Sequence, residues 1–185
     1  EYGGKPFGEM VENTYIKAAL IESARKIGVE ILIGSVENIK SESSFVNVIL
    51  NSGKNIKAQL LIGADGAKSK IRELSGIKSK GWDYKQAGIV LSISHEKPHS
   101  GIAHERFLPS GPFAILPLPG NRSSLVWTEK IDLAPLIMKL NEKDFMEELE
   151  SRIGIFLGKI SQEGARWSYP LTLRQSTSYI EKRIA

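Results

Sequence analysis

The chain has 185 residues, of which 41% are hydrophobic and 25% charged, and its formal net charge is +4 at pH 7. This composition is typical of a globular protein that can bury a core, and the interspersed lysines and glutamates do not make the clustered basic face that nucleic-acid binding needs. Cysteine is absent and no apolar run is long enough to span a membrane, which excludes disulfides, thiolate metal sites and membrane-spanning helices from the sequence.

The first element predicted along the chain is a helix. Apolar residues recur at helical spacing from Ile16 to Ile27. Asn13 is the expected N-cap, and Gly28 is the expected glycine that ends the helix.

Strand patterns follow this helix. Residues 29–33 predict a short strand, and residues 36–57 predict a β-meander with a turn at Asn51-Ser52-Gly53. The apolar run Leu60-Leu61-Ile62 then predicts a buried strand that leads directly into the most informative segment of the chain.

That segment, residues 63–72, contains Asp65-Gly66 before a short helical pattern that ends at Gly76. A strand, a tight turn and a helix start commonly present backbone N–H groups to a phosphate. Asp65 is expected to accept from a sugar hydroxyl or a water, Gly66 to let the backbone approach a ligand, and Arg72 to favour an anion. Asp-Gly is also an ordinary turn, and Asp before a helix is an ordinary N-cap.

The second half of the chain predicts an antiparallel sheet followed by two helices and further strands. Asn141 is a candidate cap for the second helix, which carries an apolar stripe. One face of the sheet is expected to roof a cavity. The predicted strands are residues 89–94, 102–108, 113–118, 124–128, 167–173 and 179–185, and the predicted helices are residues 133–140 and 143–156.

The histidines do not predict a metal site. His95 and His99 have helical spacing, but Pro98 between them makes a shared helix face unfavourable, so we interpret them with His104 as solvated residues at strand ends. Glu105 and Arg106 are either a substrate-side pair or, as we favour, a cross-strand salt bridge.

The pattern Asp65-Gly66-x-x-Ser69-x-x-Arg72 after an apolar strand resembles a fingerprint of the FAD-dependent aromatic hydroxylases, the family of para-hydroxybenzoate hydroxylase. Nearly the whole chain is similar to the ubiquinone-biosynthesis branch of that family. The residues that carry this narrower resemblance occur in order and are Val11-Glu12-Asn13, Gly81-Trp82-Asp83-Tyr84 with Gln86, Glu105-Arg106-Phe107-Leu108-Pro109 with Gly111-Pro112, Leu116-Pro117-Leu118, and Tyr169-Pro170-Leu171.

The resemblance implies an α+β fragment of a flavoprotein. Residues 1–81 are expected to be a partial FAD-binding domain, residues 82–174 a substrate domain of antiparallel sheet and helices, and residues 175–185 a return strand toward the first domain. The family's Gly-x-Gly-x-x-Gly unit and its later Gly-Asp motif are both absent. The chain is therefore expected to be a central fragment that is inactive alone.

The resemblance also implies the chemistry. Such enzymes use FAD, NAD(P)H and O₂ to hydroxylate a phenolic ring, here a polyprenylated phenol. Phe107, Leu116 and Leu118 are expected to form part of the wall of the substrate cavity.

Glu12 is expected near the flavin, Val36 near the adenine through its backbone, and Asp65 near the ribose and pyrophosphate. No catalytic residue is predicted. A cytoplasmic location is implied, and association with the inner face of a membrane or with a biosynthetic complex stays open.

Two other functions are compatible with the same sequence. One is a non-catalytic module that binds a hydrophobic ligand or a partner, and the other is a flavin reductase of the same superfamily. The position of ring hydroxylation and the oligomeric state are not encoded in any motif.

Overall fold

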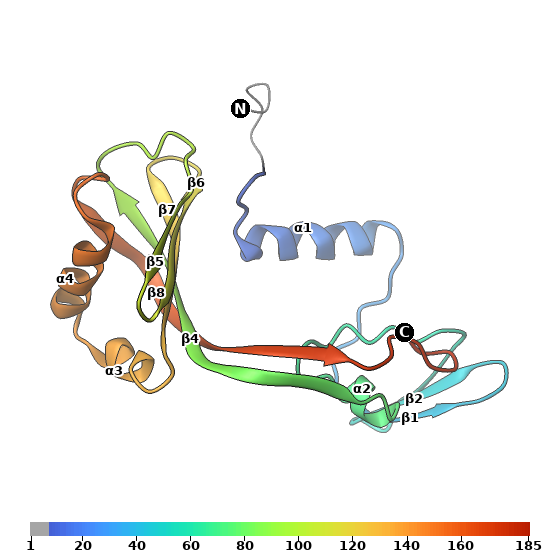
Figure 1. Ribbon diagram of the computed structural model, residues 1–185. Coiled ribbons are helices and arrows are strands. Elements are labelled where there is room, and N and C mark those ends of the chain that lie inside the picture. Colours follow the sequence, from blue (N-terminus) through green and yellow to red (C-terminus); the bar gives the residue numbers. More distant parts are fainter. Residues whose placement is uncertain (1–7) are drawn as a thin grey trace. The chain divides into compact units, whose positions relative to one another are not determined.

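The computed structural model describes residues 8–185 and shows two units, each assembled from separate parts of the sequence (Figure 1). Unit 1 contains the described residues up to Ile21 together with Asp83–Leu171, and unit 2 contains Glu22–Trp82 and Thr172–Ala185. The start of the first predicted domain, residues 1–7, lies outside the described residues. Among the helices of the described chain, none has the length and apolarity needed to cross a lipid bilayer.

The predicted first helix is confirmed as α1, Asn13–Lys26. Asn13 is its first helical residue and not its cap. Gly28, at φ +82°, ends the helix in the left-handed conformation that glycine adopts without strain. The Val29 N–H donates to the Ala24 carbonyl at 3.0 Å, which completes the closing turn. No residue of α1 is buried, so packing contributes little to holding it.

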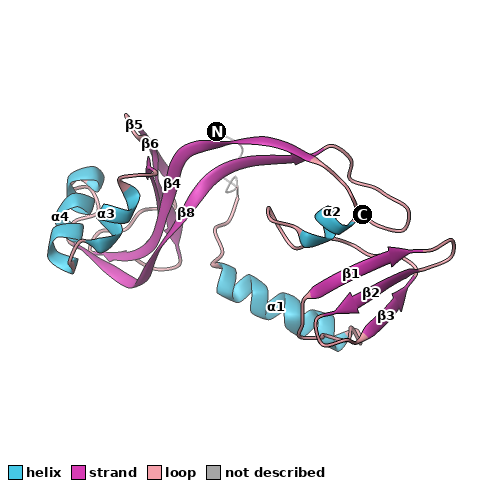
Figure 2. Ribbon diagram, turned by 90° about the horizontal axis from the view of Figure 1, so that it is seen from below, coloured by secondary structure: helices cyan, strands magenta, loops and turns pink. Residues whose placement is uncertain are grey.

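The predicted β-meander is also confirmed (Figure 2). Three antiparallel strands lie in sequence order, and the central strand buries alternate residues, as expected where one face packs on a core. The strands are β1 Val36–Ser41, β2 Val46–Leu50 and β3 Asn55–Ala58, and the buried residues are Val46, Val48 and Leu50.

Three strands predicted in unit 2 are wrong. Residues 29–33 form no strand, and residues 60–62 and 179–185 make only isolated bridges, including a parallel one between Leu61 and Ile184. Leu60 and Ile62 are exposed and not buried. An apolar run indicates a strand only if a neighbouring strand pairs with it, and the run itself does not specify that neighbour.

The five-stranded antiparallel sheet confirms the α+β prediction. Four of its strands are longer than the sequence indicated, and β5 is two residues shorter. The spatial order is β5-β6-β7-β4-β8. Two helices connect β7 to β8. The bounds are β4 Ser79–His95, β5 His104–Leu108, β6 Gly111–Leu118, β7 Arg122–Lys130, α3 Ala134–Lys139, α4 Glu142–Ile153 and β8 Ile160–Ser176.

One face of this sheet packs against α3 and α4 (Figures 1 and 2). The Asn141 side chain caps α4, as predicted, by accepting from the Asp144 N–H at 2.9 Å. The core between sheet and helices is built from large residues at alternating strand positions and from the stripe of α4. Its largest members are Trp127, Phe113, Phe145, Ile89, Ile93, Ile115, Leu125, Leu149 and Ile153.

The opposite side of the sheet, which α3 and α4 leave uncovered, carries smaller side chains. We call it the open face and define it by Val90, Ser92, Ala114, Leu116, Ser124 and Val126, all half-buried. The register aligns Val90, Val126 and Ala114 in one row across three strands. Ser92, Ser124 and Leu116 form the next row on the same face. Residues of one row project from the same face of a sheet.

Candidate functional site

The loop that contains Asp65 is tied to the start of α2, Lys70–Leu74. One Asp65 carboxylate oxygen accepts a hydrogen bond from the Ser69 hydroxyl. The other accepts from the backbone N–H groups of Lys70, at 2.7 Å, and Ile71, at 3.1 Å. The Ser69 hydroxyl in turn accepts from the Arg72 N–H at 3.0 Å. The first N–H groups of α2 are therefore paired within the chain, and a bound phosphate would need other donors.

The electrostatics of Asp65 follow from this bonding. Partial desolvation raises the pKa of Asp65, but the hydrogen bonds from Ser69 and from the N–H groups of Ile71 and Lys70 outweigh it. The pKa of the Asp65 carboxyl therefore lies below its ordinary value. Asp65 stays ionised near neutral pH and holds the loop in place.

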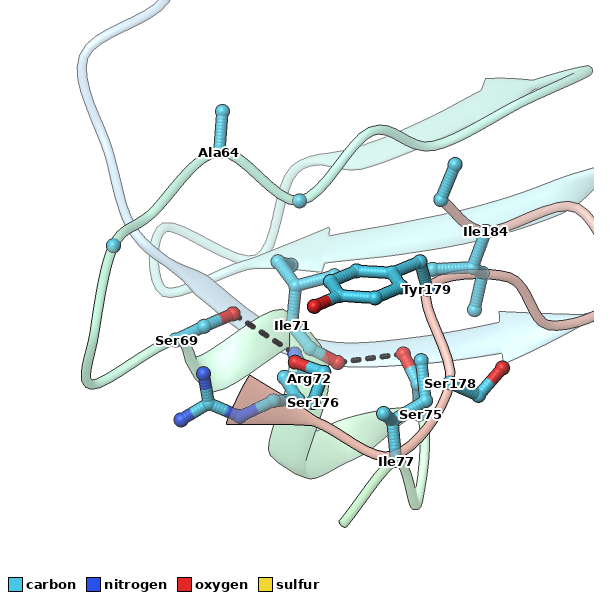
Figure 3. A pocket seen from close by; sticks show the side chains of 13 residues that line it. Ala64, Ser69, Ile71, Arg72, Ser75, Ile77, Ser176, Ser178, Tyr179 and Ile184 are labelled. Atoms are coloured by element: carbon cyan, nitrogen blue, oxygen red, sulfur yellow. Dashed lines mark hydrogen bonds between the residues drawn. The ribbon is translucent and has the colours of Figure 1, made fainter. Parts of the chain in front are cut away.

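A cavity of about 380 Å³ lies beside this loop within unit 2 (Figure 3). Its lining combines hydroxyl groups, a guanidinium, an aromatic ring and apolar side chains. That mixture of apolar surface with a few polar groups is typical of small-molecule sites. The lining residues are Gly63, Ala64, Gly66, Ser69, Ile71, Arg72, Ser75, Ile77, Ser176, Ser178, Tyr179, Ile184 and Ala185.

The five residues predicted to bind a cofactor do not all come together. Gly66 and Arg72 line the cavity, whereas Asp65 does not. Val36 starts β1 in the same unit, opposite Leu50. Glu12 belongs to unit 1. Gly66, at φ +86°, has no atom within 4 Å of the position that a Cβ would take, so the backbone there is open to a ligand.

Glu12 is held by an arginine that the sequence analysis did not identify. Arg122 Nη1 and Nη2 donate to the two Glu12 carboxylate oxygens, each at 3.1 Å, and Arg122 Nε donates to Glu163 at 2.6 Å. The hydrogen bonds from Arg122 lower the pKa of Glu12, and desolvation opposes them only in part. Hydrogen bonds to Glu12 and Glu163 raise the pKa of Arg122. No local pattern could have predicted this network, because its members lie far apart in the sequence.

This pairing predicts a specific response to acid. Because folding lowers the pKa of Glu12, the pair contributes stability above the ordinary glutamate pKa of about 4.3. That stability is lost as the pH falls through the lower folded value. A carboxyl-carbon NMR titration should give Glu12 a midpoint below the ordinary value, and Arg122→Met should raise it. Lys143→Met, which removes an exposed partner of Glu147, is the control. An identical Glu12 midpoint with and without Arg122 would contradict the pairing.

The histidine interpretation is wrong for His95, which is 6% exposed. Its ring is satisfied internally, by the Lys97 carbonyl at 2.8 Å and the Ser123 hydroxyl at 3.0 Å. Among residues 8–185, no group of three or more metal-ligating side chains is placed to hold an ion.

The salt bridge favoured for Glu105 and Arg106 does not form in the described chain, because neighbouring residues of a strand point to opposite faces. Arg106 donates instead to the Arg152 carbonyl.

Comparisons with known proteins agree with one another. The model of the FAD binding domain family matches residues 4–157. The ubiquinone hydroxylase UbiL of Rhodospirillum rubrum is 42% identical over 182 residues, which cover 97% of this chain and 42% of that protein. The 3-demethoxyubiquinol 3-hydroxylase of Escherichia coli is 31% identical over 181 residues, which cover 96% of this chain and 46% of that protein. The chain thus spans less than half the length of these relatives.

Solved structures share the fold. The flavin-dependent halogenase CmlS matches with a TM-score of 0.76 at 14% sequence identity, over 94% of this chain and 34% of that one. At this level of identity the likeness supports the arrangement of helices and strands and carries no statement about substrate.

Proposed function

Since the chain belongs to the FAD binding domain family, we propose that it is the central part of a flavin-dependent monooxygenase that hydroxylates a polyprenylated phenolic ring in ubiquinone biosynthesis. The observation that carries this proposal is the similarity to the R. rubrum hydroxylase along 97% of the chain. A non-catalytic binding module or a flavin reductase accounts less well for similarity to two hydroxylases.

The residues around the cavity of unit 2 fit one side of a cofactor site. Gly66 leaves the backbone open, Arg72 supplies a cation, and Ser176 and Ser178 line the same cavity as the apolar residues Ile71 and Ile77. In the proposal, Gly66 and Arg72 contact FAD directly, and Asp65 acts through the loop that it holds. Val36 contributes its backbone. FAD, when bound, supplies the redox chemistry, with NAD(P)H as the reductant.

The open face of unit 1 is proposed to take the ring of the substrate. Leu116 and Val126 give it apolar surface, and Phe107, 84% exposed, extends that surface at the β5 edge. Leu118 is buried, so its side chain contributes less to such a wall than the sequence analysis expected. These residues exclude water from the ring and orient it, while O₂ is the second substrate. On this proposal, residues 1–81 and 175–185 serve the cofactor and residues 82–174 serve the substrate.

We further propose a cytoplasmic location with peripheral contact at the inner face of a membrane. A polyprenylated substrate would reside in the lipid phase, and a net charge of +4 favours anionic lipid weakly. The ring position that is hydroxylated and the oligomeric state are not part of the proposal.

The decisive experiment uses the protein expressed from its complete reading frame. We expect bound FAD, NAD(P)H oxidation that depends on a 2-polyprenylphenol, and one ¹⁸O atom from ¹⁸O₂ in the product. Gly66→Ala should lower FAD retention, because a side chain is strained at this positive φ and would occupy the space through which a ligand reaches the backbone. Gly53→Ala is a matched control, since that glycine also has a positive φ and open space but lies in the meander turn. Protein without flavin, or product without label, would contradict the proposal.

A further inference from the structure

The ion network of Arg122 lies beside the open face. Arg122 is in the row of Ser94 and Leu118, which is the next row on the same face after that of Ser92, Ser124 and Leu116. Because Arg122 and Ser124 are two residues apart on β7, their side chains project from the same side of the sheet. The network therefore places charge at one end of the open face, and Glu105, aligned with Ala114 at the β5 edge, is a further carboxylate on that face.

The hydrogen bonds of this network leave one carboxylate oxygen unused. All three guanidinium nitrogens of Arg122 donate to carboxylates, and both oxygens of Glu12 accept from Arg122. Glu163 accepts through Oε2 only, and its Oε1 accepts no hydrogen bond from residues 8–185. The Glu163 side chain is 34% exposed, so it is partly open to solvent. One guanidinium and two carboxylates leave the network with a net negative charge.

Building on the proposed function, we infer that Glu163 Oε1 accepts a hydrogen bond from the ring hydroxyl of a neutral phenol lying on the open face, and that Arg122 is the positioning residue that holds Glu163. The geometry supports this because the Nε hydrogen bond fixes the carboxylate through its other oxygen. A long side chain such as glutamate otherwise samples many rotamers, and fixing it in advance removes that cost from binding.

The charge of the network selects the chemical class of ligand. A phenolic hydroxyl donates to an ionised carboxylate in a charge-assisted hydrogen bond. A ring that carries a carboxylate is repelled, because no guanidinium nitrogen is without a carboxylate partner. A methyl ether keeps the shape of the phenol but has no hydrogen to donate. The side chains of Ser92, Ser124 and Val126 are small and aligned by the register, which suits a planar ring lying flat against them.

The test is a ¹⁵N NMR titration of the full 185-residue chain with 4-propylphenol, 4-propylanisole and 4-propylbenzoate. We expect shifts at Ser124 and Glu163 and roughly ten- to hundredfold tighter binding of the phenol than of the anisole. Glu163→Gln should lower this ratio about fivefold or more, since a neutral acceptor is weaker than a carboxylate. Arg122→Lys, which cannot contact both carboxylates with the same geometry, should lower it too. Glu147→Gln on α4 is the matched control.

Each outcome separates the two proposals. A ratio that falls in Glu163→Gln and Arg122→Lys but not in Glu147→Gln supports the inference. Equal binding of phenol and anisole on the open face, unchanged by Glu163→Gln, overturns it and leaves the proposed ring surface standing. Absent binding, or shifts confined to other surfaces, overturns both the inference and the placement of the ring. The Glu163→Gln result holds even if Arg122→Lys fails to fold, because the two variants are read independently.

Discussion

Replacing Asp65 by alanine is expected to open the start of α2 and, through it, to weaken cofactor binding. The substitution removes the acceptor of three hydrogen bonds, from the Ser69 hydroxyl and the N–H groups of Lys70 and Ile71. Loss of a capping carboxylate of this kind costs about 2–3 kcal/mol of local stability. Amide hydrogen exchange at Lys70 and Ile71 should therefore accelerate roughly 30- to 150-fold.

Two further variants make this expectation specific. Asp65→Asn keeps an oxygen that can accept from the N–H groups but loses the charge, so it should cost less than alanine. Glu73→Gln, which changes charge on the same short helix, is the control. Unchanged exchange in Asp65→Ala, together with lost FAD, would show that the carboxylate contacts the cofactor directly and that its role in the loop is minor.

The second large effect is expected at Phe145, where alanine should destabilise unit 1 by about 3–5 kcal/mol. The Phe145 side chain is fully buried. Its ring lies 6.0 Å from that of Trp127, and the Arg166 guanidinium stacks on it at 4.0 Å. Removing the ring leaves a cavity between α4 and the sheet, which the surrounding strands can fill only in part.

Phe107→Ala is a control that removes the same ring from an exposed position. Because Phe107 is 84% exposed, its loss should change the unfolding free energy by no more than about 0.5 kcal/mol. Denaturant unfolding followed by near-ultraviolet circular dichroism measures both variants. Similar destabilisation by the two substitutions would mean that Phe107 is packed in solution, and the open face would then be covered by another part of the chain.

The elements predicted well from sequence are those with local signals. The stripe of α4, its Asn141 cap and the alternation of β2 each lie within a few residues, so a short window contains the physical cause. The strands predicted at residues 29–33 and 60–62 were wrong. A strand depends on a pairing partner, and a short window of sequence does not include that partner. The family itself could be inferred because residues 65–72 carry an ordered pattern.

The site was harder to predict than the fold. Asp65 before a helix is equally suited to a ligand and to the N–H groups of α2, and only the three-dimensional structure shows that it bonds to α2. The pairing of Glu12 with Arg122 joins positions 110 residues apart, and charged residues are common enough that composition does not select the partner. The prediction that His95 is solvated failed for a related reason. The Ser123 hydroxyl that hydrogen-bonds to the His95 ring comes from another strand.

The parallel bridge between Leu61 and Ile184 also sets an order of events during synthesis. Unit 2 is complete only when Thr172–Ala185 reaches Glu22–Trp82, and Asp83–Leu171 must emerge from the ribosome in between. At about 5–20 residues per second, that interval lasts roughly 5–20 s. During it the meander exists without its closing segment, while the strands of unit 1 are still being made, ending with β8. Throughout this delay the apolar run at residues 60–62 lacks the partner that Ile184 later provides, which is the state in which an unpaired strand edge is open to pairing with another chain.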